Sequence, residues 1–189
     1  KSGAAGNIGT DTVAKAEGDG KTIGVSIAGP LGVNALLFRT MPYDVEKDIE
    51  LVSIAVSQPS VLVVGAKSST TDAKQLAALM AQKTRLSFAS IGAGSISHLA
   101  MAALVAQTGA DAVHVPYRGS GAAVTALLSG DVDMALLPAA AVMPHVKAGK
   151  LRALAVASDQ RSPSLPDLPT LGESGLPDIK GDAWIGFIA

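Results

Sequence analysis

The sequence predicts an α/β protein with doubly wound sheets and two lobes. From residue 71 onward, helical segments alternate with short, β-branched, apolar segments, which is typical of a parallel sheet covered by helices. An apolar run over 51–65 is interrupted at Gln58-Pro59, and proline cannot donate a hydrogen bond to a sheet, so we expect the chain to cross between lobes there. A proline-rich stretch after Ser158 leads to one last strand, which indicates a return to the first lobe.

The alternation sets the expected elements of the second lobe. Gly119-Ser120 opens the best-marked helix and Gly130 ends it. The expected helices cover 72–82, 96–108, 119–129 and 139–148, and the expected strands cover 86–90, 112–116, 133–137 and 151–157.

The flanking segments are less regular. We expect the chain to divide into three parts: 1–59 as part of lobe 1, 60–158 as lobe 2, and 159–189 as the return crossover and strand to lobe 1. Within them we expect helices over 7–17 and 33–38, a strand over 21–29, a polar loop over 41–50, a helical turn at 171–174 and a final strand over 183–189.

Composition narrows the function classes. Hydrophobic residues make up 48% and charged residues 16%, which indicates a packed domain. Aromatic residues reach only 3% and the net charge is −1, so neither stacking platforms nor a basic surface is available for nucleic acid. There is no cysteine, so disulfides, thiolate metal sites and a cysteine nucleophile are excluded. The abrupt beginning and end suggest a fragment, whose lack of a signal peptide says little about location.

The turn Gly92-x-Gly94-x-x-Ser97 follows an expected strand and opens an expected helix, a layout that holds anions. It approaches the dinucleotide fingerprint, which also requires an acidic residue at the end of the next strand. That strand ends in Pro116, Tyr117 and Arg118 instead. Because Arg118 is suited to a 2′-phosphate, an NADP-dependent oxidoreductase stays an alternative.

Serine nucleophile and metal chemistry are poorly supported. No Gly-x-Ser-x-Gly elbow is present, and His98 lies on the same helical turn as Ser95, which is not the arrangement of a catalytic triad. His98, His114 and His145 are widely separated in the sequence and have no carboxylate pair nearby, so we interpret them as structural and expect no metal site.

Anion binding is the favoured interpretation. The N–H groups of Gly94, Ser95, Ile96 and Ser97 and the hydroxyls of the two serines are expected to point out of the end of helix 96–108. Gly119 and Ser120 repeat this arrangement one strand later. Each serine alone is explained as an N-cap, but two such starts at neighbouring strand ends predict a carboxylate or phosphate site.

Six blocks in order resemble the substrate-binding receptors of tripartite tricarboxylate transporters, the Bug-type periplasmic solute-binding proteins. The blocks are "KSGAAGNIG", "MPYDVEKDIELVSIAVSQPSVLVV", "FASIGAGSISHLA", "HVPYRGSGAAVTALLSGDVDM", "PHVKAGKLRALAVAS" and "RSPSLPDLPTLGESGLP". The resemblance implies a type II periplasmic-binding fold that closes on a small organic acid for a membrane permease, with no cofactor and no enzyme activity. Its carboxylate contacts fall on Ser26, Gly94, Ser95, Ser97, Gly119 and Ser120.

Departures from the family pattern limit this prediction. The family's opening strand with its glycine-proline loop and its C-terminal helices are absent from this chain, so the first lobe is expected to be incomplete. We therefore expect weak binding, self-pairing of the truncated lobe to cover an exposed sheet edge, or a stable core without activity. "MALLPAA" at 134–140 lacks the polar groups of relatives, so the acid stays open among di- or tricarboxylates, aromatic acids and amino acids.

Overall fold

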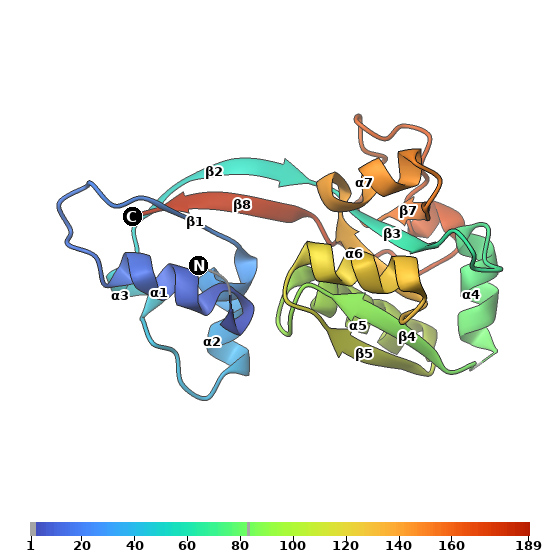
Figure 1. Cartoon of the computed structure of the whole chain (residues 1–189), viewed down its shortest axis with the longest axis horizontal. Helices are drawn as coiled ribbons and strands as arrows, with labels where there is room; N and C mark the ends of the chain where they lie inside the picture. The colour runs from blue at the N-terminus through green and yellow to red at the C-terminus, as the bar shows by residue number, and fades with distance from the viewer. Residues whose placement is uncertain (1–2, 83) are drawn as a thin grey trace.

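The computed structural model describes residues 3–82 and 84–189 and contains two sheets. Two strands of the smaller sheet extend towards the larger sheet as a paired ribbon (Figure 1). The larger sheet has the strand order β5-β4-β6-β3-β7 and the smaller one β1-β8-β2. The strands are β1 (Gly24–Ser26), β2 (Leu51–Gln58), β3 (Ser60–Gly65), β4 (Leu86–Ser90), β5 (Ala112–Pro116), β6 (Met134–Pro138), β7 (Leu151–Val156) and β8 (Ala183–Ile188).

Helices cover both faces of the larger sheet, as the sequence predicted. One face packs against α4 and α5 through Leu62, Met80 and Met101, and the other against α6 and α7 through Val63 and Leu127. The helices are α1 (Asn7–Ala14), α2 (Asn34–Leu37), α3 (Val45–Asp48), α4 (Ala73–Ala81), α5 (Ile96–Thr108), α6 (Ser120–Ser129) and α7 (Ala139–Lys147), with short turns η1 (Ala4–Gly6), η2 (Gly29–Val33) and η3 (Gly172–Ser174).

Strand β3 is antiparallel to its neighbours, whereas the sequence predicted a parallel sheet. β4 is parallel to β5 and β6, but β3 is antiparallel to both β6 and β7. Ser60 at its start pairs with Pro138 at the end of β6, so the chain enters this sheet at the edge where the parallel strands end. A central strand that is buried on both faces is apolar along its length whichever way it runs. The hydrophobic pattern of residues 60–65 therefore did not indicate the direction of β3.

The smaller sheet is antiparallel throughout, and β8 lies between β1 and β2. β2 belongs to this sheet and β3 to the larger one, so the chain passes between the sheets at Gln58-Pro59. The apolar residues of the small sheet are largely exposed: Leu51 is 62% exposed, Ile54 66% and Phe187 42%. The C-terminus lies at the end of β8 in this part of the molecule (Figure 1).

A buried polar network holds the small part together. The Tyr43 hydroxyl lies 3.1 Å from Asn7 Oδ1, and Asn34 Nδ2 donates to the same oxygen at 2.6 Å. Asn34 is fully buried, so loss of this bond would leave a polar group unsatisfied. The expected polar loop over 41–50 contains α3, which Asp44 caps by accepting from the N–H of Glu46.

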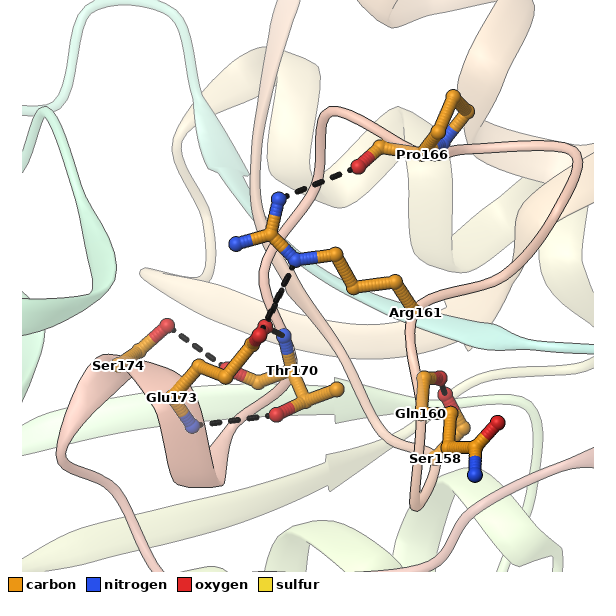
Figure 2. Close-up of polar contacts among 7 residues, drawn as sticks. All are labelled: Ser158, Gln160, Arg161, Pro166, Thr170, Glu173 and Ser174. Atoms are coloured by element: carbon orange, nitrogen blue, oxygen red, sulfur yellow. Dashed lines mark hydrogen bonds and ion pairs between the residues drawn. The ribbon is translucent and has the colours of Figure 1, made fainter.

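Hydrogen bonds among its own residues hold the return segment between β7 and β8 together (Figure 2), and backbone bonds of Val156 with Pro169 and Leu171 join it to β7. Thr170 and Glu173 form a reciprocal capping box, since Thr170 N–H donates to Glu173 Oε2 at 2.8 Å and Glu173 N–H to Thr170 Oγ1 at 3.1 Å. Arg161 Nε donates to the same carboxylate at 2.9 Å, and its Nη1 donates to the carbonyl of Pro166. These contacts lower the pKa of Glu173, with the Thr170 N–H as the larger cause.

Within the described ranges, no helix has the length and apolar character needed to cross a membrane.

Candidate functional site

The turn after β4 is built from glycines and two buried serines. Gly92 and Gly94 have φ angles of 137° and 81°, which side chains rarely adopt, so the tight turn requires glycine. Ser95 is the N-cap of α5, because its Oγ accepts a hydrogen bond from the His98 N–H at 3.3 Å. The Ser95 hydroxyl in turn donates to the carbonyl of Gly92 at 2.6 Å. Ser97 Oγ accepts from the Ile91 N–H at 3.0 Å. The hydroxyls of both serines therefore stabilise the turn.

The backbone donor of Gly94 is also in use. Its N–H donates to His98 Nδ1 at 3.1 Å, whereas the sequence interpretation had this group pointing at a ligand. Gly94 is instead in contact with the small part of the molecule: a Cβ added to it would lie 2.8 Å from Asn34 Oδ1 and 2.9 Å from Leu37 Cδ1. At the start of α5, the N–H groups of Ile96 and Ser97 have no acceptor in the described part of the chain.

Two of the three histidines are stacked next to this turn, although they lie far apart in the sequence and were expected to be separate. The ring centroids of His98 and His114 are 3.9 Å apart with an interplanar angle of 15°, and His114 Nε2 lies 2.7 Å from Ser90 Oγ. Burial lowers the pKa of His98, and burial together with the charge of His98 lowers the pKa of His114 to about 4. Both rings are therefore neutral at pH 7, as the bond that His98 Nδ1 accepts requires.

The N-terminus of α6 is open by contrast. Gly119, with φ 95°, occupies the N-cap position, and glycine has no side chain with which to cap the helix. Among the described residues, the N–H groups of Ser120, Gly121 and Ala122 and the Ser120 hydroxyl have no hydrogen-bond partner. These four donors lie at the positive end of the helix dipole, where an anion is stabilised.

Two adjacent cavities have lining residues from the small sheet region and from the ends of the large-sheet strands. The outer cavity measures about 630 Å³ and is lined by Ser95, Arg118 and Gly119 among others. The inner chamber measures about 300 Å³ and is lined by Gln58, Ile96 and Trp184 among others. Ile27, Ile91 and Ser120 line both, so the open helix N-terminus lies where the two cavities meet.

The six expected ligand residues divide into two groups. Ser95, Gly119 and Ser120 line the cavities, whereas Ser26, Gly94 and Ser97 are not among the lining residues. Ser26 is 4% exposed, and its hydroxyl lies 2.8 Å from Thr10 Oγ1 inside the small part. Its neighbours Ile27, Ala28 and Gly29 face the inner chamber instead. Ligand binding by these six residues stays a prediction.

The cavities also contain residues that the sequence reasoning missed. Trp184, the single tryptophan, and Ile185 come from β8, and Gln58 comes from the end of β2. Gln58 Oε1 accepts from the N–H of Ala140 at 2.9 Å and so caps α7 across the crossing between the sheets. The only sign in the sequence that Gln58 lies near the site was its position next to Pro59, where the chain crosses between the sheets.

Metal ligands do not gather at this site. Within residues 3–82 and 84–189, no group of three or more His, Asp or Glu side chains is placed to hold a metal ion. Arg118 is the charged residue that lines the cavities, and its side chain is exposed.

Known proteins match the whole chain. Residues 1–189 match the family described as the tripartite tricarboxylate transporter family receptor. The chain belongs to this receptor family. An uncharacterised-family protein from the tcbD-tcbE intergenic region of Pseudomonas sp. (strain P51) is 41% identical over all of this chain and 56% of its own length.

Solved structures of family receptors have the same fold as this chain. The Rhodopseudomonas palustris protein Rpa4515 with adipate superposes with a TM-score of 0.96 at 33% identity, over 100% of this chain and 64% of that one. The periplasmic binding protein BugD gives a TM-score of 0.91 at 32% identity, over 100% of this chain and 63% of that one. The chain thus spans about three fifths of the length of these relatives, and the expected family and periplasmic-binding fold are confirmed.

Proposed function

We propose that this chain is the ligand-binding part of an extracytoplasmic receptor that reversibly captures a small organic carboxylate for a tripartite tricarboxylate-type transporter. The observation that supports this most directly is the open N-terminus of α6 at the junction of the two cavities. A carboxylate there accepts hydrogen bonds from the Ser120 hydroxyl and the first N–H groups of the helix, and the helix dipole adds to the attraction. Bound adipate in the related protein supports a carboxylate ligand.

The chain would divide into lobes as the sequence suggested. Residues 1–59 and 159–189 would form the smaller lobe and its return, apart from residues 1 and 2, which lie outside the described residues, and 60–158 would form the larger lobe. Closure would bend the molecule at Gln58-Pro59 and near the start of β8, where the two chain crossings lie. Membership of the family supports a periplasmic location and membrane permease subunits as partners.

Isothermal titration with a panel of small carboxylates tests this proposal through two substitutions at one position. Ser120→Ala removes only the hydroxyl, whereas Ser120→Pro also removes a backbone donor. Proline fits the first helical position, and the preceding Gly119 has an extended ψ of 174° that suits it. A hydrogen bond to a charged group contributes about 1.5–3 kcal/mol, so we expect about a 10-fold loss of affinity for the first variant and about 100-fold for the second.

The matched control is Ser129→Ala at the opposite, C-terminal end of the same helix, which should leave affinity unchanged. Equal affinity of the wild-type chain and Ser120→Pro for every carboxylate bound would refute the site. Uptake of NADP, with a change in its fluorescence, in place of carboxylate would instead favour the oxidoreductase alternative.

Self-pairing of the small lobe stays a prediction. The exposed apolar side chains of β2 and β8 support it, because such surfaces are commonly covered in an assembly. A single monomeric species across a concentration series in light scattering would contradict it.

A further inference from the structure

The inner chamber is mainly apolar and shares Ser120 with the outer cavity. Isoleucines from both parts of the molecule and Trp184 line it together with Ser120. The isoleucines are Ile27, Ile91, Ile96 and Ile185. A ligand whose charged end lies at Ser120 therefore places the rest of its body against hydrocarbon.

The chamber offers no charge to a second carboxylate. Among the described residues, no Lys, Arg or His lines it, and Arg118 lies in the outer cavity on the other side of Ser120. Gln58 is its one amide side chain, and the oxygen of that amide already accepts from Ala140. A carboxylate moved from water into such surroundings loses its hydration without gaining a counter-ion.

The third helix N-terminus near the chamber, that of α7, is largely closed to ligands. The Ala139 N–H donates to the carbonyl of Pro59 at 3.0 Å, and the Ala140 N–H donates to Gln58 Oε1 at 2.9 Å. Acceptors of the chain itself therefore satisfy the first two donors of α7. The free donors of α6, and the free N–H of Ile96 at the start of α5, follow the neighbouring strands β5 and β4, whereas the α7 side of the cleft, after β6, presents mainly apolar surface.

We propose that this receptor prefers monocarboxylates with an uncharged, apolar body, aliphatic or aromatic, over dicarboxylates of the same length. This rests on the proposed function, because it assumes that the charged end of the ligand binds at Ser120. The preference differs from the dicarboxylate, adipate, bound in the related Rhodopseudomonas palustris structure.

The test is a titration of the chain with pairs that differ only at the far end: hexanoate against adipate, and benzoate against terephthalate. We expect the monocarboxylate of each pair to bind at least tenfold more tightly. Hexanamide separates carboxylate recognition from adsorption to the exposed apolar sheet, and it should not bind. Adipate binding as tightly as hexanoate would overturn this inference and leave the proposed function intact. Failure of all four acids to bind would overturn both.

A charge placed in the chamber gives an independent measurement. Ile185→Lys puts an ammonium group at the far end and should reverse the order, so that adipate binds more tightly than hexanoate. Phe187→Lys is the matched control, since it adds the same charge to the same strand but does not line the chamber. An unchanged order in a folded Ile185→Lys variant, with its fold checked by circular dichroism, would overturn the inference.

Discussion

Gly94 offers the sharpest test of how the two parts of the molecule fit together. In Gly94→Ala the added Cβ would lie 2.8 Å from Asn34 Oδ1 and 2.9 Å from Leu37 Cδ1. Leu37 is half exposed and has room to move, but Asn34 is fully buried and held by its 2.6 Å bond to Asn7. The contact can therefore be relieved mainly by separating the small part from the larger one.

Two free-energy terms set the size of the effect. An alanine with φ near 81° costs about 1–2 kcal/mol in backbone strain. Overpacking against a buried side chain adds about 1–3 kcal/mol. Gly109→Ala is the matched control, because Gly109 also has a positive φ, 66°, but nothing lies within 4 Å of its added Cβ. The loss of stability in Gly109→Ala therefore measures the backbone strain without overpacking.

The assay is urea unfolding of both variants, followed by carboxylate titration. We expect Gly94→Ala to be about 1–3 kcal/mol less stable than Gly109→Ala and to bind the carboxylate more weakly, since closure over the cavities is impaired. Equal unfolding free energies and equal affinities for the two variants would refute the reasoning, because the contact with Asn34 would then carry no cost.

Three further predictions concern the supporting side chains. The His114 pKa falls from 6.5 to about 4 on folding, so stability is complete above about pH 6.5 and decreases as the pH falls towards 4; urea unfolding at pH 7 and pH 5 should differ by at most about 2 kcal/mol, a difference that shrinks in His114→Asn. Asn34→Ala removes the shorter of the two hydrogen bonds to Asn7 Oδ1 and leaves the Tyr43 hydroxyl as its partner, so it should cost about 0.5–1.5 kcal/mol in urea unfolding, whereas an unchanged midpoint would contradict the network. Glu173→Gln weakens the contact with Arg161 and the capping box, so limited proteolysis should cut the 157–172 segment faster than in the wild type; equal rates would show that other contacts hold it.

The elements of the larger part were predictable because each has a local signal. Expected strand 86–90 and helix 96–108 coincide with β4 and α5, since a short, largely apolar run, a glycine turn and a serine N-cap mark their ends. The direction of β3 had no such signal, because it depends on where the chain enters the sheet. The expected strand over 21–29 shrank to Gly24–Ser26, since the residues that follow it form η2.

The site was only partly predictable for a related reason. Sequence spacing shows that a serine lies at a helix start, but it does not show whether the hydroxyl faces a cavity or its own turn. Ser97 and Ser120 both occupy the first turn of a helix, yet one bonds to the Ile91 N–H and the other lines both cavities. Trp184 lies far along the chain from either serine, and only the return of β8 to the cleft brings it there.

The paired strands β2 and β8 form the bridge between the two parts of the molecule (Figure 1). Their pairing has register shifts between Leu51 and Ser53 and between Ile54 and Val56, irregularities at which a ribbon bends more easily than a regular pair does. A bridge of this kind keeps each half of the cleft at a high effective concentration near the other, without the wide search of a flexible tether. The affinity for a ligand held by both halves would then depend on the bending stiffness of this ribbon, so substitutions in β2 far from the ligand should change how quickly the ligand is released.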